Sequence, residues 1–208
     1  MKFKPLDIKS SLRHLKADKR LVNVIKKHGP IKPEFNKTKD PFQSLLKSII
    51  YQQISGKAAE SILKKFLGLF PKKKFPTPED VLKIKFEKLR GAGLSSQKAA
   101  YIIDLARKFK DGSVSSKNFH KMSDGEIIEH LTLVKGIGVW TVQMFLMFTL
   151  NRPDILPTGD LGIQKGFQKL FGLKRLPSSV QMEKLSINWR GHRTVASLYL
   201  WKMVDERR

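Results

Sequence analysis

A Gly-x-Gly turn, Gly136-Ile137-Gly138, separates two segments, 124–133 and 139–150, that are both expected to be helices. Glycine has no Cβ, so the backbone at such a turn can bend sharply and approach a ligand closely. The second helix then begins with N–H groups that lack intrahelical acceptors and with the positive end of its dipole. This combination is typical of a phosphate-binding site. The alternative is a tight helix connection that binds nothing, but the basic character of the chain favours phosphate binding.

A single carboxylate, Asp160, ends the loop 155–160, which also contains Pro157 and Gly159. It precedes the segment 161–171, which is expected to be a helix. An acid at this position can simply be a helix N-terminal residue that the dipole stabilises. Near a phosphate-binding turn, the same carboxylate would face the sugar of a bound nucleotide. There it could stabilise a developing oxocarbenium ion or orient an attacking water molecule. The residue pattern leaves both interpretations open.

The elements that position these groups are predicted to be helical. Apolar residues recur at helical spacing in 41–50 and again in 57–67. Capping signals precede three further helices, namely Thr77 before Pro78, Ser123 with Glu126, and Ser178 with Gln181. Residues 82–86 alternate like a strand, but their helical neighbours favour a helix–turn–helix. Residues 139–150 and 192–204 are apolar on nearly every side and predict core helices. The predicted fold class is therefore all-α.

The composition restricts the partners. The 208 residues include 41 Lys and Arg against 18 Asp and Glu, a formal net charge of +23 that is spread along the chain. Such an excess favours a polyanionic partner, nucleic acid first and an anionic membrane surface second. No segment pairs a basic face with a long exposed apolar face, which argues against the membrane. With no cysteine, the chain has no disulfide, thiolate zinc site or cysteine-ligated iron–sulfur cluster.

Five segments in this order resemble the helix-hairpin-helix–GPD superfamily of DNA glycosylases, and within it the 3-methyladenine DNA glycosylase II (alkylbase) branch. The segments are PFQSLLKSIIYQQIS at 41–55, LRGAGLSSQKAAYIIDLA within 89–107, the turn Gly136-Ile137-Gly138, the loop Pro157-Thr158-Gly159-Asp160, and WRGHRTVASLYLW at 189–201. One departure is Gly191, where a proline is commoner in the family. The resemblance favours the catalytic interpretation of Asp160.

The resemblance implies a two-lobed helical fold with the active-site cleft between the lobes. Residues 1–208 would form a single glycosylase unit, in which one lobe is about 43–155 and contains the hairpin 124–150. The other lobe would combine 1–42 with 156–208. Some relatives carry an additional N-terminal β-domain, which we do not expect here because the chain begins close to the helical core.

The residue at position 140 separates subclasses of this family. Members that also nick the DNA backbone place there a lysine that forms a Schiff base with the sugar. Here it is Trp140, and an indole cannot be that nucleophile. Lys135 lies on the wrong side of the turn to replace it. We therefore expect a monofunctional enzyme without AP lyase activity, which removes the base with water as nucleophile and leaves an abasic site.

The resemblance also implies a pocket for the flipped base, lined by Trp140, Met144 and Trp201. Purines alkylated at N3 or N7 are cationic, and an electron-rich ring face attracts a cation by about 0.5–2 kcal/mol. A cationic base is also a good leaving group, which suits a site with one carboxylate and no evident general acid. For Trp140 and Trp201 the alternative is core packing with a partner for the indole N–H.

Contacts with DNA follow from the same family pattern. The N–H groups of Gly136, Gly138 and Thr141 would bind phosphate, and Gln53 would be the wedge inserted into the gap left by the flipped nucleotide. The family also holds a monovalent cation, Na⁺ or K⁺, on hairpin carbonyls, which here are those of Thr132, Val134 and Ile137. No other cofactor is expected, and the expected partner is double-stranded DNA that contains damaged bases.

We expect a monomer that is intracellular and located with the DNA, in the cytoplasm of a prokaryote or the nucleus of a eukaryote. No membrane association is expected, because no apolar run approaches the roughly 18 residues of a membrane span. Two other functions stay open. One is a glycosylase of the same fold for deaminated or ethenylated bases such as hypoxanthine or ethenoadenine. The other is a non-catalytic helix-hairpin-helix module that binds DNA lesions.

Overall fold

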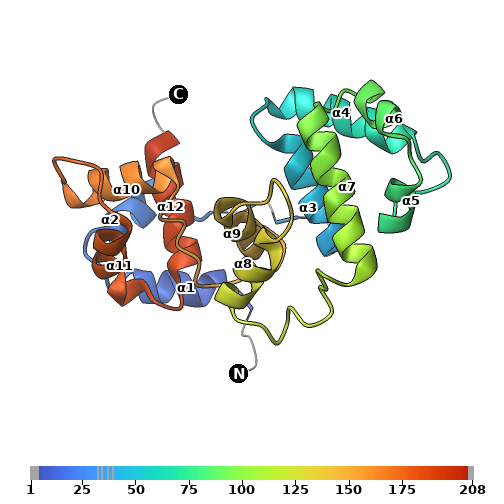
Figure 1. Cartoon of the computed structure of the whole chain (residues 1–208). Helices are drawn as coiled ribbons and strands as arrows, with labels where there is room; N and C mark the ends of the chain where they lie inside the picture. Colours follow the sequence, from blue (N-terminus) through green and yellow to red (C-terminus); the bar gives the residue numbers. More distant parts are fainter. Residues whose placement is uncertain (1–4, 32, 34, 37, 39, 206–208) are drawn as a thin grey trace. The chain divides into compact units, whose positions relative to one another are not determined.

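The computed structural model describes residues 5–31, 33, 35–36, 38 and 40–205 (Figure 1). These residues form twelve α-helices and one 3₁₀ turn, and no strand occurs among them. The all-α prediction is therefore confirmed. Of the helices in this part of the chain, none is long and apolar enough to cross a membrane. The elements in chain order are α1 (Ile8–Leu15), α2 (Leu21–His28), α3 (Pro41–Tyr51), α4 (Gly56–Gly68), α5 (Pro78–Leu82), α6 (Phe86–Gly91), α7 (Ser96–Asp111), α8 (Asp124–Thr132), α9 (Val139–Phe148), α10 (Leu161–Phe171), α11 (Ser179–Leu185), η1 (Ile187–Trp189) and α12 (Arg193–Asp205).

The described residues divide into two compact units. The first is 36–145, and the second combines 5–35 with 146–205. The boundaries thus fall at 35/36 and 145/146, whereas the sequence suggested 42/43 and 155/156. The reason lies in the loop after α9. Thr194 of α12 donates its hydroxyl to the carbonyl of Arg152 and its N–H to that of Pro153, so this loop packs with α12.

In the first unit, side-chain caps set where the helices begin. Asp40, Ser55, Thr77, Ser95 and Ser123 each accept the N–H of a residue three positions later. The reciprocal capping box expected at Ser123 and Glu126 is present. Of the strand-like residues 82–86, the first ends α5, the last begins α6, and 83–85 form the turn between them, as the helical interpretation predicted. Helix α7 contacts α3, α5 and α6 and so runs through the middle of this unit.

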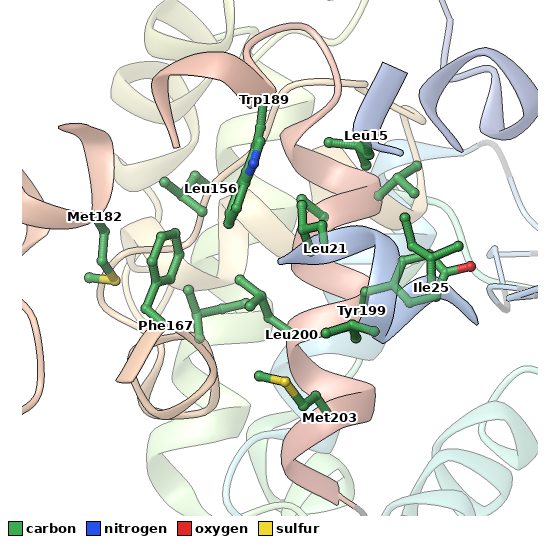
Figure 2. Packing of buried hydrophobic residues seen from close by; sticks show 14 residues of the cluster. Leu15, Leu21, Ile25, Leu156, Phe167, Met182, Trp189, Tyr199, Leu200 and Met203 are labelled. Atoms are coloured by element: carbon green, nitrogen blue, oxygen red, sulfur yellow. The ribbon is translucent and has the colours of Figure 1, made fainter. Parts of the chain in front are cut away.

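In the second unit, a hydrophobic core surrounds α12 (Figure 2). Helix α12 contributes Tyr199 and Leu200, α10 contributes Phe167, and Trp189 covers them from η1. The prediction of a core helix over 192–204 is confirmed by seven buried residues in α12. The corresponding prediction for α9 is wrong at its first turn, where Val139 and Trp140 are about half exposed. That turn follows the hairpin directly and is presented to solvent.

Gly191, where a proline is commoner in the family, has a backbone conformation that proline cannot adopt. Gly191 adopts a φ of 83°, in the left-handed region. A proline ring fixes φ near −65°, so proline could not replace this glycine without rebuilding the turn before α12.

Candidate functional site

The hairpin between α8 and α9 turns at Gly136, which has a φ of 81°. A Cβ at this residue would lie 2.0 Å from Cδ2 of Tyr101, on α7. Its carbonyl accepts a hydrogen bond of 2.9 Å from Nε2 of Gln52. Gly138 has no positive φ, and a Cβ there would meet no atom within 4 Å. Only Gly136 is therefore required by the turn, whereas Gly138 leaves the start of α9 open to an approaching group.

A buried carboxylate, that of Asp104, is hydrogen-bonded to the backbone of the turn. Asp104 of α7 is 7% exposed, and it accepts the N–H of Lys135 at 2.9 Å and the ammonium of Lys108 at 2.8 Å. Burial alone would raise the pKa of Asp104, but the hydrogen bonds from Lys108 and Lys135 hold it below its ordinary value. The Lys135 N–H therefore belongs to the scaffold and not to the surface that would meet phosphate.

The three N–H groups expected to bind phosphate differ in their surroundings. Gly138 is exposed, Gly136 is half-buried, and Thr141 is 7% exposed. The first hydrogen bond of α9 runs from the N–H of Val142 to the carbonyl of Gly138, the residue just before the helix. Helix geometry leaves the N–H groups before it without acceptors inside the helix. Phosphate binding at this turn stays a prediction.

The carbonyls expected to hold a monovalent cation belong to Thr132, Val134 and Ile137, at the end of α8 and in the turn. The last carbonyls of a helix have no intrahelical donor, so their neutral oxygens are available as ligands for a monovalent cation. The Val134 carbonyl accepts the N–H of Ile137 at 3.1 Å, which leaves it a second lone pair. Nowhere in the described chain do three His, Asp or Glu side chains gather to hold a metal ion. The cation site stays a prediction.

A cavity of about 600 Å³ opens beside the hairpin within the first unit. Five residues that the sequence singled out line it, together with others; the lining is Ser48, Tyr51, Gln52, Gln53, Ser95, Gln97, Lys98, Tyr101, Gly136, Trp140, Thr141 and Met144. Trp140 is 48% exposed, which excludes the core-packing alternative for this residue. The cavity offers a half-exposed indole and a thioether to a planar ligand.

Sequence reasoning missed Gln52, Lys98 and Tyr101. Lys98 and Tyr101 lie in the segment 89–107 that contributed to the resemblance, but no role was assigned to them. Their spacing of three residues on a helix places them on the same side of α7. That spacing was the available signal, although it does not identify what the side chains contact.

Gln53, the expected wedge, lies two residues after the end of α3, behind the C-cap residue Gln52. It is exposed and has a φ of 57°, which is uncommon for a residue other than glycine. Just before it, the ammonium of Lys98 donates to the carbonyls of Ile50 and Gln52, each at 2.7 Å. Burial lowers the pKa of Lys98 below that of an exposed lysine.

The carboxylate of Asp160 lies in the second unit, at the N-terminus of α10. Its Oδ1 accepts the N–H of Ile163 at 2.9 Å, which confirms the helix-capping interpretation. The same oxygen accepts the indole N–H of Trp201 at 2.8 Å. Gly162 permits this contact, because a Cβ there would lie 2.8 Å from Cδ1 of Trp201. A half-buried carboxylate with two directed N–H donors has a fixed orientation, as stabilisation of a cationic sugar requires.

Helix α12 holds residues 152–155, at the start of the segment that leads to Asp160. Thr194 also accepts the N–H of Ile155 through its hydroxyl, and Ser197 donates to the carbonyl of the same residue. One turn earlier, Arg193 forms an ion pair of 2.7 Å with Asp154. Trp201 completes this side of the helix and stacks on Phe148, with ring centroids 6.4 Å apart. The partner that the indole N–H was expected to need is therefore the candidate catalytic residue itself. The expectation that the Trp201 ring also lines the base pocket stays a prediction.

Comparisons with known proteins show which proteins the chain resembles. Residues 46–190 match the family model described as HhH-GPD superfamily base excision DNA repair protein. DNA-3-methyladenine glycosylase 1 of Schizosaccharomyces pombe is 36% identical over 185 residues, which cover 88% of this chain and 80% of the relative. A putative DNA-3-methyladenine glycosylase of Bacillus subtilis, YfjP, is 33% identical over 79% of this chain, which spans 59% of that longer relative.

Solved structures extend the likeness over nearly the full length. The Schizosaccharomyces pombe 3-methyladenine DNA glycosylase Mag1, in complex with abasic DNA, superposes with a TM-score of 0.81 at 34% identity and covers 94% of this chain and 97% of its own. A DNA-3-methyladenine glycosidase from Bacillus halodurans gives a TM-score of 0.86 at 33% identity, with 100% of this chain and 94% of that chain covered.

Proposed function

Because this chain belongs to the HhH-GPD superfamily of base excision DNA repair proteins, we propose that it is a monofunctional DNA glycosylase for alkylated purines. It binds double-stranded DNA as a monomer inside the cell, flips a 3-methyladenine or 7-methylguanine type of base, and hydrolyses the N-glycosidic bond. The observation that carries this proposal is the carboxylate of Asp160, oriented by the indole of Trp201 and by the N–H of Ile163.

The chemistry needs one anion and one water molecule. The glycosidic bond breaks with its electron pair moving to the cationic base, which leaves in neutral form. The ionised Asp160 stabilises the positive charge that develops on the sugar. Water then adds to C1′ and loses a proton, so the products are the free base and an abasic site. Since the leaving group is already cationic, no protonating acid is required.

The cavity of the first unit would receive the flipped base. Its exposed indole at Trp140 and the thioether of Met144 form an electron-rich surface that a cationic purine prefers over a neutral one. The distributed excess of Lys and Arg draws the enzyme to any duplex without selecting a sequence. Selection of the base therefore rests on the cavity and on the ease with which a damaged pair opens.

The hairpin binds the DNA backbone in this mechanism. The N–H groups of Gly136, Gly138 and Thr141 face the phosphate, with Gly138 the most open of the three. The carbonyls of Thr132, Val134 and Ile137 hold Na⁺ or K⁺, whose charge would attract the same phosphate. No further cofactor takes part.

Absence of strand cleavage follows from the amines near the cavity. Trp140 offers no amine where lyases have one, and the amine of Lys98 donates to the carbonyls of Ile50 and Gln52, each at 2.7 Å. Attack of this amine on a sugar would require both bonds to break. Sodium borohydride should therefore trap no covalent complex with abasic DNA. A trapped complex that disappears in Lys98→Met would contradict the monofunctional assignment.

The decisive test is a product analysis. The protein is incubated with methylated DNA, and separately with duplexes that contain uracil, hypoxanthine, ethenoadenine or 8-oxoguanine, without divalent metal, and the freed bases are identified by chromatography. We expect 3-methyladenine and 7-methylguanine. Release of hypoxanthine or ethenoadenine alone would favour the deaminated or ethenylated substrates. Binding of abasic DNA without release of any base would favour the non-catalytic module.

A further inference from the structure

A chain of hydrogen bonds connects three elements of the first unit. From α7, the ammonium of Lys98 donates to the carbonyls of Ile50 and Gln52 at the end of α3. The Gln52 side chain then donates from Nε2 to the carbonyl of Gly136, at 2.9 Å in the hairpin. The bonded residues are 46 and 48 positions apart in the first step and 84 apart in the second. The end of α3 is therefore attached to α7 on one side and to the hairpin on the other.

The position of the Lys98 amine has a clear structural benefit. The last carbonyls of α3 have no donors within the helix, and a buried carbonyl without a partner is unfavourable. Lys98 supplies two of these missing bonds although burial lowers its pKa, which means that its charged form is held at a cost. An ammonium with three donors can serve both carbonyls at once.

Gln53 is the next residue in the sequence after Gln52, which takes part in these bonds. Its left-handed φ of 57° is an unfavourable conformation for an unconstrained glutamine, and it persists where the surroundings impose it. Here the surroundings are identifiable, because the residue just before it is held at its carbonyl by Lys98 and at its side chain by Gly136. The side chain of Gln53 is exposed at the cavity rim, so it is free to act outside the unit.

We propose that Lys98 and Gln52 are positioning residues, which hold Gln53 in the backbone conformation needed to enter the DNA and attach it to the phosphate-binding hairpin. This proposal rests on the proposed function, since it assigns a step of base flipping. A side chain that fills a gap in the stack is more effective when its backbone is already fixed, because less freedom is lost on insertion. Phosphate contacts supply most of the affinity, so binding should change little when the positioning is lost.

Lys98→Met tests the first bond, and Lys110→Met is its matched control. Lys110 lies in the last turn of the same helix, is exposed and carries the same charge. The duplex contains a stable abasic analogue with 2-aminopurine as the adjacent base, whose fluorescence rises when it becomes unstacked. Lys98→Met should lose most of the fluorescence rise and lower the single-turnover excision rate by about tenfold or more, as removal of the donor to two helix-end carbonyls predicts. Its Kd for the duplex should stay within about threefold, because phosphate contacts dominate affinity.

Gln52→Glu tests the second bond with almost no change of shape, since a carboxylate cannot donate to the Gly136 carbonyl. Gln181→Glu, exposed on α11 in the other unit, is its control for added charge. We expect the same loss of fluorescence and rate in Gln52→Glu, and recovery of the Lys98→Met defect in Lys98→Arg, which keeps a cationic donor. These readouts separate positioning from stability, which thermal unfolding of each variant measures independently.

Wild-type fluorescence and rate in Gln52→Glu and in folded Lys98→Met would overturn the proposal. If Lys98→Met does not fold, Gln52→Glu decides alone. The fluorescence assay requires only binding to an abasic analogue, so it tests positioning even if the wild-type protein releases no alkylated base. Failure of the proposed function and failure of the positioning role are therefore distinguishable.

Discussion

The indole N–H of Trp201 donates to Oδ1 of Asp160 across 2.8 Å, and the same oxygen caps α10 through the N–H of Ile163. Two elements thus fix one carboxylate, α10 through its backbone and α12 through a side chain. An aromatic residue that the family pattern assigns to the base pocket therefore also orients the carboxylate that we propose to be catalytic. This geometry makes separate predictions for the donor and for the acceptor.

Replacement of Trp201 by phenylalanine removes the donor and keeps an aromatic ring. A hydrogen bond to a charged group contributes about 1.5–3 kcal/mol, so the excision rate should fall by about tenfold or more. Single-turnover kinetics on methylated DNA measure the effect. The control is Trp189→Phe, which removes an indole bond of 2.9 Å to Asp18 in the core of the same unit. That variant should lower the melting temperature and leave excision by the folded protein unchanged. Equal rates in Trp201→Phe and wild type would argue that the indole does not orient Asp160.

Asp160→Asn should abolish excision and preserve the fold. Asparagine caps helices about as well as aspartate, and its oxygen can still accept from Ile163 and Trp201. The missing negative charge should slow excision by at least about 10²–10³-fold, as loss of an electrostatic contact to the transition state does. Gel-shift assays should show unchanged affinity for abasic DNA, and Asp205→Asn, exposed near the end of α12, controls for the loss of one charge. Release of 3-methyladenine at the wild-type rate would exclude the proposed mechanism.

Two alanine substitutions in the hairpin should differ in their effect on the stability of the protein. Gly136→Ala places a methyl group 2.0 Å from the Tyr101 ring at a φ of 81°, so it should destabilise the protein by about 1–3 kcal/mol. Gly138→Ala meets open space and should change the free energy of unfolding by less than about 1 kcal/mol. Denaturant unfolding measures both values. A loss of DNA affinity in the stable Gly138→Ala variant would locate the backbone approach at that residue, and unchanged affinity would argue against it.

Acid should weaken the attachment of the hairpin to α7. The pKa of Asp104 is below its ordinary value in the folded protein, so the folded state binds this proton less readily than the unfolded chain does. The stability contributed by this carboxylate is therefore complete above the unfolded pKa of 3.8 and is lost as the pH falls through the lower folded value. Asp104→Asn should reduce stability by about 1–3 kcal/mol at neutral pH.

Urea unfolding between about pH 6 and about pH 3 measures this dependence, and the difference between wild type and Asp104→Asn should narrow toward the acid end. Asp205→Asn again serves as the control, because Asp205 is exposed. A difference between the two proteins that is constant over this range would show that Asp104 does not titrate with folding.

Local signals in the sequence were sufficient for the elements. Ser123 and Glu126 form the expected capping box, and the helix expected at 161–171 runs over those residues. The hairpin glycines and the position of Asp160 at a helix start were also predictable, because caps, turns and helical periodicity depend on residues a few positions apart. The local pattern misjudged the first turn of α9, since an apolar sequence does not reveal which end of a helix faces solvent.

The sequence by itself therefore determined the helical class, the family pattern and the two chemical features, a glycine turn and one carboxylate. Only the tertiary structure decided what holds them. Asp104 reaches Lys135 over 31 residues, Trp201 reaches Asp160 over 41, and Gln52 reaches Gly136 over 84. Such partners are set by the path of the chain and the packing of α7 and α12. A side chain's type states only which hydrogen bonds it can make, and the fold selects the partner.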